Sequence, residues 1–295
     1  MTLYYSPGGG NSPRDSQTVA DNQAATFYRT LTDFHGGWYE WGGLQQAIFI
    51  AGNFTAASLH NASNTWPDLD MMPMGPGWWG KSTEQDDRGQ TIATLWVVGR
   101  YPLFSAGALP LDNRTLSYLV NPLALALNRR EETESAPIPT RVFYEGNCTC
   151  SGGLTSCTIP HGPEDHPALP CLAKWVAPVP AVAAAAAHAA PKPACGRGAA
   201  SHPSSTTSSS FSSSSLWTAL AVINLGEDAA NTTTGFAEMG LPARATDSYA
   251  VLDVWTGQSL GVFAGDATIA TALRPHASVL LQVAVAAAGD GGGRC

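Results

Sequence analysis

The spacing between apolar runs changes partway along the chain, and this change constrains the fold more than any other feature. In residues 1–130, short β-prone runs such as Ala25–Arg29 alternate with stretches of helical pattern such as Gln90–Gly99. Strands separated by helical stretches of about 10–15 residues are typical of βα units and a parallel sheet. In residues 216–285, β-like runs follow one another closely, at the spacing of about 8–12 residues that is typical of an antiparallel sandwich.

The patterns predict individual elements in both regions. In the first region, we expect strands at Thr2–Ser6, Ala25–Arg29 and Pro102–Ser105, and helices at Leu44–Ala51, Gln90–Gly99 and Leu111–Leu119. Asp112 and Asn113 are plausible capping residues for the last of these helices. In the second region, we expect strands at Leu216–Leu225, Asp247–Val254, Ser259–Phe263, Thr268–Leu273 and Ser278–Val283.

The segment between these regions, residues 131–215, has a different composition. It begins with a candidate strand at Thr140–Glu145, continues into a cysteine-rich loop, and ends in a tract rich in Ala, Pro and Ser. Such a tract cannot bury enough apolar surface to offset the entropy lost on ordering, so residues 175–214 are expected to be flexible. The tail at 286–295 is expected to be disordered for the same reason.

Composition excludes several classes of partner. The 295 residues carry a formal net charge of −8, and only 13% of them are charged. Nucleic acids and anionic membranes attract basic surfaces, so neither is an expected partner. No apolar run reaches the roughly 20 residues of a membrane span.

The cysteines and glycosylation sequons favour an oxidising compartment. Cys148, Cys150 and Cys157 lack the paired C-x2-C knuckles of a zinc site, so a loop disulfide is favoured over a metal site with His161 or His166. The N-terminus has neither a basic region nor an apolar region, so it is not a signal peptide. Either the protein is not secreted or its true start is missing. The sequons, which support a secretory route, begin at Asn53, Asn61, Asn113, Asn147 and Asn231.

Two polar clusters lie where strands of the first region are expected to end. They are Y-R-T-L-T-D at residues 28–33 and W-P-D-L-D-M-M-P at residues 66–73. In a β/α barrel, catalytic groups lie at the carboxyl ends of the strands. Carboxylates there suit sugar chemistry, because one can protonate a glycosidic oxygen while others bind hydroxyls. Arg29 could bind a hydroxyl with its forked donors, and Trp66 could cover the apolar face of a sugar.

Each of these residues also has a structural interpretation. Asp33 fits a simple turn residue, and Arg29 fits one partner of a surface ion pair. In the second cluster, the carboxylates can cap the turn after a strand and the large apolar side chains can belong to the core; these residues are Asp68, Asp70, Trp66, Met71 and Met72. The residues by themselves therefore define no substrate.

Seven segments, in order along the chain, resemble the melibiase-type α-galactosidases, family 27 of the glycoside hydrolases. The resemblance is to the plant and algal branch that includes β-L-arabinopyranosidase/α-galactosidase enzymes. The most specific segments are W-P-D-L-D-M at 66–71 and W-T-G-Q-S-L-G at 255–261, combined with P-H-A-S at 275–278. The seven segments lie at 4–8, 28–33, 66–71, 90–107, 121–128, 251–263 and 273–281.

The resemblance implies a role for each cluster. Asp33 matches the general acid/base of a retaining double displacement, a reaction that requires no cofactor and no metal. The expected substrates are saccharides that end in α-D-galactose or β-L-arabinopyranose. The residues implied to bind them are Ser6, Arg29, Trp66, Asp68, Asp70 and Met71.

The resemblance also implies a fold, namely the C-terminal half of a (β/α)8 TIM barrel (about strands 5 to 8) followed by an antiparallel β-sandwich. The family's nucleophile, an Asp in a K-x-D motif on the fourth strand, has no counterpart here. We therefore expect an inactive fragment, or else a non-catalytic sugar-binding remnant. An open half-barrel exposes two strand edges, which favours self-association. The full-length parent is expected to be secreted, extracellular or vacuolar.

Overall fold

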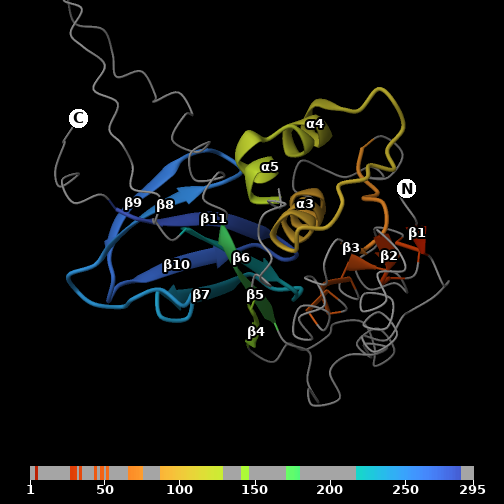
Figure 1. The fold of residues 1–295 in the computed structure, drawn as a ribbon. Coiled ribbons are helices and arrows are strands. Elements are labelled where there is room, and N and C mark those ends of the chain that lie inside the picture. The colour runs from red at the N-terminus through yellow and green to blue at the C-terminus, as the bar shows by residue number, and fades with distance from the viewer. Residues whose placement is uncertain are drawn as a thin grey trace, which may run out of the picture.

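A computed structural model gives the fold of the chain (Figure 1). It describes residues 4–5, 27–31, 33–34, 43–44, 47–49, 51–52, 66–75, 87–128, 141–145, 171–179 and 217–286. No helix within these residues is long and apolar enough to cross a membrane.

Three short strands form a parallel sheet near the N-terminus. They are β1 (Tyr4–Tyr5), β2 (Phe27–Arg29) and β3 (Trp66–Asp68), in that spatial order. The expected strand at Pro102–Ser105 is reduced to a single parallel bridge between Ser105 and Met72, beyond β3. The sheet thus presents four parallel strand positions in sequence order, as one half of a β/α barrel does.

Helices follow the strand positions as expected. Residues 44, 47–49 and 51–52 are helical, as predicted for that segment. Helix α3 (Arg88–Val98) precedes the Ser105 bridge, and α4 (Asn113–Leu119) and α5 (Pro122–Asn128) come after it. Asp112 caps α4, because its carboxylate accepts a hydrogen bond from the backbone N–H of Thr115 at 2.8 Å.

The C-terminal region is the predicted antiparallel sandwich. Its larger sheet has six strands in the order β4-β5-β6-β11-β8-β9, and β7 pairs with β10 in a second sheet. The strands are β4 (Arg141–Glu145), β5 (Leu172–Val179), β6 (Trp217–Asn224), β7 (Ala230–Gly235), β8 (Ser248–Asp253), β9 (Ser259–Ala264), β10 (Thr268–Leu273) and β11 (Ser278–Val285).

The sandwich includes two strands from the segment that was expected to stand apart. The prediction of flexibility is wrong for residues 175–179, which belong to β5. β5 pairs with β4 on one side and with β6 on the other. The alternation in L-A-K-W-V-A-P-V explains the strand, because Trp175 faces one core while Leu172 and Val176 face the other. The high Ala and Pro content obscured this alternation.

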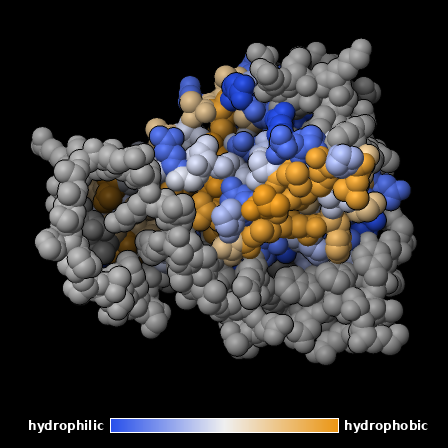
Figure 2. Space-filling view, turned by 90° about the horizontal axis from the view of Figure 1, so that it is seen from above, coloured by the Kyte–Doolittle hydropathy of each residue, from blue (hydrophilic) through white to orange (hydrophobic). Residues whose placement is uncertain are grey.

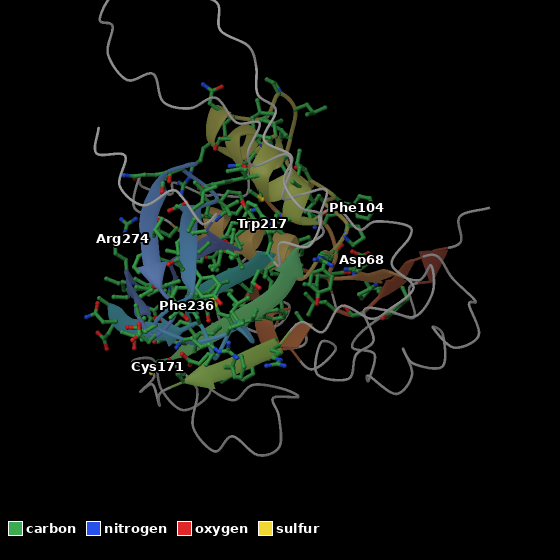
Figure 3. The ribbon with its side chains drawn as sticks, turned by 60° about the vertical axis from the view of Figure 1, so that its left-hand side comes forward. Asp68, Phe104, Cys171, Trp217, Phe236 and Arg274 are labelled. Atoms are coloured by element: carbon green, nitrogen blue, oxygen red, sulfur yellow. The ribbon has the colours of Figure 1, made fainter. Side chains whose placement is uncertain are left out.

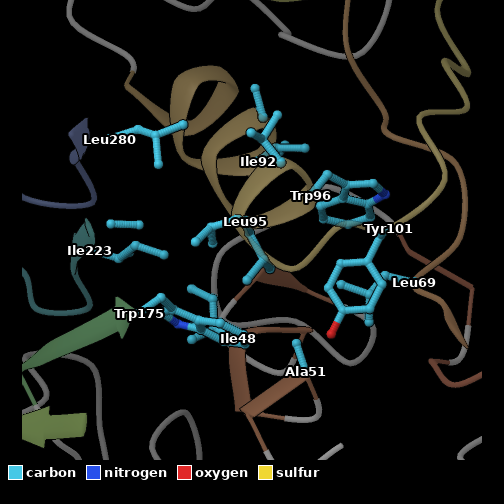
Figure 4. Packing of buried hydrophobic residues seen from close by; sticks show 14 of the residues in the cluster. Ile48, Ala51, Leu69, Ile92, Leu95, Trp96, Tyr101, Trp175, Ile223 and Leu280 are labelled. Atoms are coloured by element: carbon cyan, nitrogen blue, oxygen red, sulfur yellow. The ribbon is translucent and has the colours of Figure 1, made fainter. Parts of the chain in front are cut away.

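The six-stranded sheet is covered on both faces. One face packs against α3, where Trp175, Ile223 and Leu280 meet Ile92 and Leu95 (Figure 4). The same core continues past Trp96 and Tyr101 to Leu69, which follows β3. The other face packs against the β7–β10 sheet through a second core. Because both of its faces are covered, every residue of the central strand β6 is buried.

A buried lysine joins the two sheets of the sandwich. Lys174 of β5 is almost fully buried, and its ammonium group contacts the Glu145 carboxylate at 2.6 Å. The same ammonium group donates a hydrogen bond to the backbone carbonyl of Thr233 in β7 at 2.8 Å. Thr232 donates to the second oxygen of Glu145 at 2.9 Å. The buried charge is therefore neutralised and hydrogen-bonded, as a buried cation requires, and the cluster is structural.

Candidate active site

The candidate site lies where β2 and β3 end. The two strands are parallel, and Arg29 lies opposite Asp68 in their register. Thr30 extends the pairing, because both its backbone N–H and its hydroxyl donate to the carbonyl of Asp68, at 2.9 and 3.0 Å. This pairing brings the carboxyl ends of the two strands together, so the clusters at 28–33 and 66–73 meet in space.

Arg29 connects the two clusters. Its guanidinium forms ion pairs with the carboxylate of Asp70 and, at 3.2 Å, with that of Asp33. The side chains of Arg29 and Asp70 are only 14% and 12% exposed, whereas Asp33 is 86% exposed. Arg29 is therefore not part of a loose surface pair. The Asp70 carboxylate is buried against Arg29, whereas the Asp33 carboxylate is open to solvent.

An ion pair and several hydrogen bonds fix both the side chain and the backbone of Asp70. Besides the ion pair, its carboxylate accepts a hydrogen bond from the backbone N–H of Phe34 at 2.8 Å. Its own N–H donates to the carboxylate of Asp68 at 2.9 Å, and its carbonyl accepts from the indole of Trp96 at 3.3 Å. Its backbone has a φ of 85°, in the left-handed region that few non-glycine residues adopt.

The structure separates the remaining candidates. Asp68 is buried and shapes the turn, which matches its structural interpretation. Met72 is a core residue, whereas Met71 is half-exposed beside the site. Ser6 and the side chain of Trp66 lie outside the described residues.

Sequence reasoning missed three supporting groups. The backbone N–H of Phe34, the hydroxyl of Thr30 and the indole of Trp96 all position the site, yet none belongs to a recognisable motif. Trp96 comes from the buried helix α3, and its ring also packs on Phe34 with centroids 5.2 Å apart. In β2, directly before Arg29, burial raises the pKa of the Tyr28 hydroxyl.

The arrangement suits the recognition and protonation of hydroxyl or glycosidic oxygens. Arg29 supplies donors, Asp70 supplies acceptors, and Asp33 places a carboxylate where a ligand can reach it. Figure 3 shows Asp68 and Phe104 on the side of the molecule that carries β1–β3, away from Cys171 and Phe236 in the sandwich. Among the described residues, no three His, Cys, Asp or Glu side chains are grouped to hold a metal ion.

Comparisons with known proteins support the motif-based resemblance. Residues 207–283 match the family profile of the alpha galactosidase C-terminal beta sandwich domain. No significant match is found among curated proteins.

Solved structures share the fold over nearly the whole chain. A family 27 β-L-arabinopyranosidase from Geobacillus stearothermophilus aligns with 98% of this chain and 51% of its own, at a TM-score of 0.62 and 19% identity. A variant of that enzyme in complex with arabinose aligns with 96% of this chain and 50% of its own, at a TM-score of 0.59 and 18% identity. α-Galactosidase I from Mortierella vinacea aligns with 95% of this chain and 67% of its own, at a TM-score of 0.55 and 15% identity.

These matches confirm the resemblance to the melibiase-type enzymes and the fold it implied, a partial barrel followed by an antiparallel sandwich. The chain spans about half the length of the arabinopyranosidase structures that it matches.

Proposed function

We propose that this chain is the sugar-binding C-terminal part of a retaining glycoside hydrolase that releases terminal α-D-galactosyl residues. The observation that supports it best is Arg29, held between the fixed Asp70 and the exposed Asp33 at the ends of two parallel barrel strands. A sugar hydroxyl can replace part of the Arg29–Asp33 contact, because the Asp33 side chain is open to solvent.

In this proposal, Asp33 is the general acid/base. It protonates the glycosidic oxygen in the first step, and it removes a proton from water in the second. The first step also needs a nucleophilic carboxylate about 5–5.5 Å away. The sequence has no K-x-D motif of the kind that supplies this nucleophile in the family it resembles, so we expect the 295-residue chain to bind sugar without turnover.

A β-L-arabinopyranosidase is the second candidate. Its support is the similarity of fold to the bacterial arabinopyranosidase along 98% of the chain. The two sugars differ by one exocyclic CH2OH group, so the side chains around that group decide between them. Met71, which is half-exposed and follows Asp70 in the sequence, is our candidate for the apolar side chain that contacts it.

Secretion of the parent protein is also part of the proposal. The sequon residues Asn113 and Asn231 are both exposed, as glycosylation requires. We also propose a disulfide at Cys171, which lies at the base of the cysteine-rich loop, where its N–H donates to the carbonyl of Glu145 at 2.8 Å. Peptide mapping without reduction, and a mass shift on deglycosylation, test these two points.

Calorimetry tests the sugar site. The purified chain is titrated with galactose and with L-arabinose, beside Asp70→Asn and an Asp253→Asn control in the sandwich. We expect binding that Asp70→Asn weakens at least tenfold and that the control leaves unchanged. A folded chain that binds neither sugar would overturn the proposal.

Hydrolysis assays test the expected lack of turnover. The substrates are p-nitrophenyl α-D-galactopyranoside and p-nitrophenyl β-L-arabinopyranoside, each with the chain and with Asp33→Asn. We expect no hydrolysis by either protein. Hydrolysis by the chain that Asp33→Asn abolishes would show that a nucleophile is present, and it would identify the preferred sugar.

A further inference from the structure

An exposed apolar stripe runs along helix α4. In the view from above, in which α4 and α5 face the viewer, hydrophobic residues gather into a continuous patch (Figures 1 and 2). Leu116 in α4 and Val120 directly after it are 40% and 62% exposed. Leu109, which precedes the helix, is 86% exposed. A grouped apolar surface of this kind marks a place where another group covers the protein.

One polar residue in the same stripe indicates what that group is. Asn113 begins α4 and is exposed, and it lies three residues before Leu116 and seven before Val120. Residues at these spacings share one face of a helix, and each side chain leans toward the start of the helix, so Leu116 leans toward Asn113. At a rise of about 1.5 Å per residue, the stripe from Asn113 to Val120 is roughly 10 Å long, which a short oligosaccharide spans.

The sequon N-R-T at 113–115 makes Asn113 an acceptor for an N-linked glycan. In this modification, the side-chain amide nitrogen attacks C1 of the first sugar of a lipid-linked oligosaccharide. A C–N bond forms and the C1–O bond to the lipid diphosphate breaks. The amide nitrogen loses one proton, and the lipid diphosphate leaves. The apolar C–H faces of the attached sugar rings can then pack on leucine and valine side chains, which removes apolar surface from water.

The environment of Thr115 indicates when Asn113 is modified. The Thr115 hydroxyl is part of the acceptor motif, yet this residue is fully buried and its hydroxyl donates to the Asp112 carboxylate at 2.9 Å. Transfer to Asn113 therefore requires a chain in which α4 has not yet formed, as during synthesis. The sequon at Asn231 differs, because Asn231 and Thr233 are both exposed on strand β7.

We propose that a glycan on Asn113 is a structural cover for the apolar stripe formed by Leu109, Leu116 and Val120. Its sugar faces pack on these side chains and keep this surface from associating with other molecules. The inference rests on the proposed secretory route. It does not depend on the sugar site at Arg29 and Asp70, so Asn113→Gln is expected to leave sugar binding by the chain unchanged.

Production of the chain in a eukaryotic secretory host, behind a cleavable leader peptide, tests the modification. Peptide mass mapping is expected to find a glycan on Asn113 as well as on Asn231. A chain that is glycosylated at Asn231 and not at Asn113 would overturn the inference and leave the secretory route intact. A chain that is modified at neither residue would overturn the inference and would also count against the secretory route.

Hydroxyl-radical footprinting, which labels exposed side chains, tests the cover. The folded glycoprotein is compared before and after enzymatic removal of its glycans, and also with Asn113→Gln and the matched control Asn231→Gln. Loss of the Asn113 glycan is expected to raise the labelling of Leu116 and Val120 at least about threefold, whereas Asn231→Gln leaves it unchanged. Val262, which is 58% exposed on β9, is the internal reference. Equal labelling of Leu116 with and without the glycan would overturn the proposal, and enzymatic removal gives this result even where Asn113→Gln does not fold.

Discussion

Asp70 occupies a backbone conformation that costs energy. A non-glycine residue at a φ of 85° carries about 1–3 kcal/mol of strain. Three contacts offset this strain: the Asp68 carboxylate accepts its N–H, Trp96 donates to its carbonyl, and Arg29 pairs with its carboxylate. The side chain is thereby fixed before any ligand arrives, which reduces the entropy lost on binding.

Asp68 is predicted to act as a positioning residue for Asp70. Asp68→Ala removes the acceptor of the Asp70 N–H, and we expect a loss of about 2 kcal/mol in the free energy of unfolding, because this hydrogen bond is buried and charged. Asp68→Asn keeps an acceptor oxygen and should lose less than half as much. Urea unfolding of both variants measures the difference, and calorimetry should show weaker sugar binding for the alanine variant. Equal losses in the two variants would contradict this role.

Asp112 is predicted to make the stability of α4 depend on pH. Burial raises the pKa of the Asp112 carboxyl, but the hydrogen bonds from Thr115 lower this pKa by a larger amount. The pKa in the folded state therefore lies below the value in the unfolded state. A lowered pKa gives stability that is complete above the unfolded pKa and is lost as pH falls through the folded pKa. Asp112→Ala should lose about 1 kcal/mol at neutral pH.

Asp112→Asn separates the charge from the cap. Asparagine caps nearly as well as aspartate but does not titrate. We therefore expect Asp112→Asn to lose little at neutral pH and to gain relative to the wild type in acid, where the wild-type carboxylate is protonated. Thermal unfolding at neutral and strongly acidic pH measures both. If the difference in stability between the wild type and Asp112→Asn does not change with pH, titration of the Asp112 carboxylate is excluded as the cause of that difference.

Helix α3 is the element that joins barrel and sandwich. It is buried almost all round, and three of its polar side chains bond to the segment that leads into β11. Gln90 donates to the carbonyl of Ser278, Thr91 donates to the carbonyl of His276, and Thr94 shares a hydrogen bond with the hydroxyl of Ser278. These contacts explain why a helix with buried threonines is stable between two apolar layers.

Thr94 is predicted to be the most sensitive of these positions. Its hydroxyl also accepts the indole N–H of Trp255 at 3.0 Å. Thr94→Val leaves that donor and the Ser278 hydroxyl without their partner, so we expect a loss of about 2 kcal/mol in the free energy of unfolding. Ser117→Ala, on the exposed face of α4, serves as the control and should change it by less than about 0.5 kcal/mol. If Thr94→Val leaves the free energy of unfolding unchanged, the hydrogen bonds of Thr94 do not stabilise the contact between α3 and the sandwich.

Sequence patterns predicted elements well where one period dominates. The alternation at Asp247–Val254 and the helical pattern at Gln90–Gly99 correspond to β8 and α3, because a sheet face or a buried helix leaves a regular apolar trace. The sequence patterns did not predict β5, because alanines occupy core positions in this strand. They also did not predict the pairing of Arg29 with Asp70, because this pairing depends on strand register and a left-handed turn rather than on spacing along the chain.

At the scale of the whole molecule, one core crosses the boundary between the two regions. Tyr28 of β2, Trp96 of α3 and Trp175 of β5 belong to the same buried cluster. We therefore predict a single cooperative unfolding transition, with tryptophan fluorescence and circular dichroism changing together. Two separate transitions would show that the partial barrel and the sandwich unfold independently.

The bonds between α3 and the start of β11 also determine when the molecule can be completed during synthesis. Their partners are 184 to 188 residues apart in sequence. At translation rates of about 5–20 residues per second, roughly 10 to 40 s pass between the emergence of the helix and that of the strand that holds it. Until β11 emerges, these hydrogen bonds of α3 cannot form, so the nascent chain depends on a late strand to complete the contacts of one of its early helices.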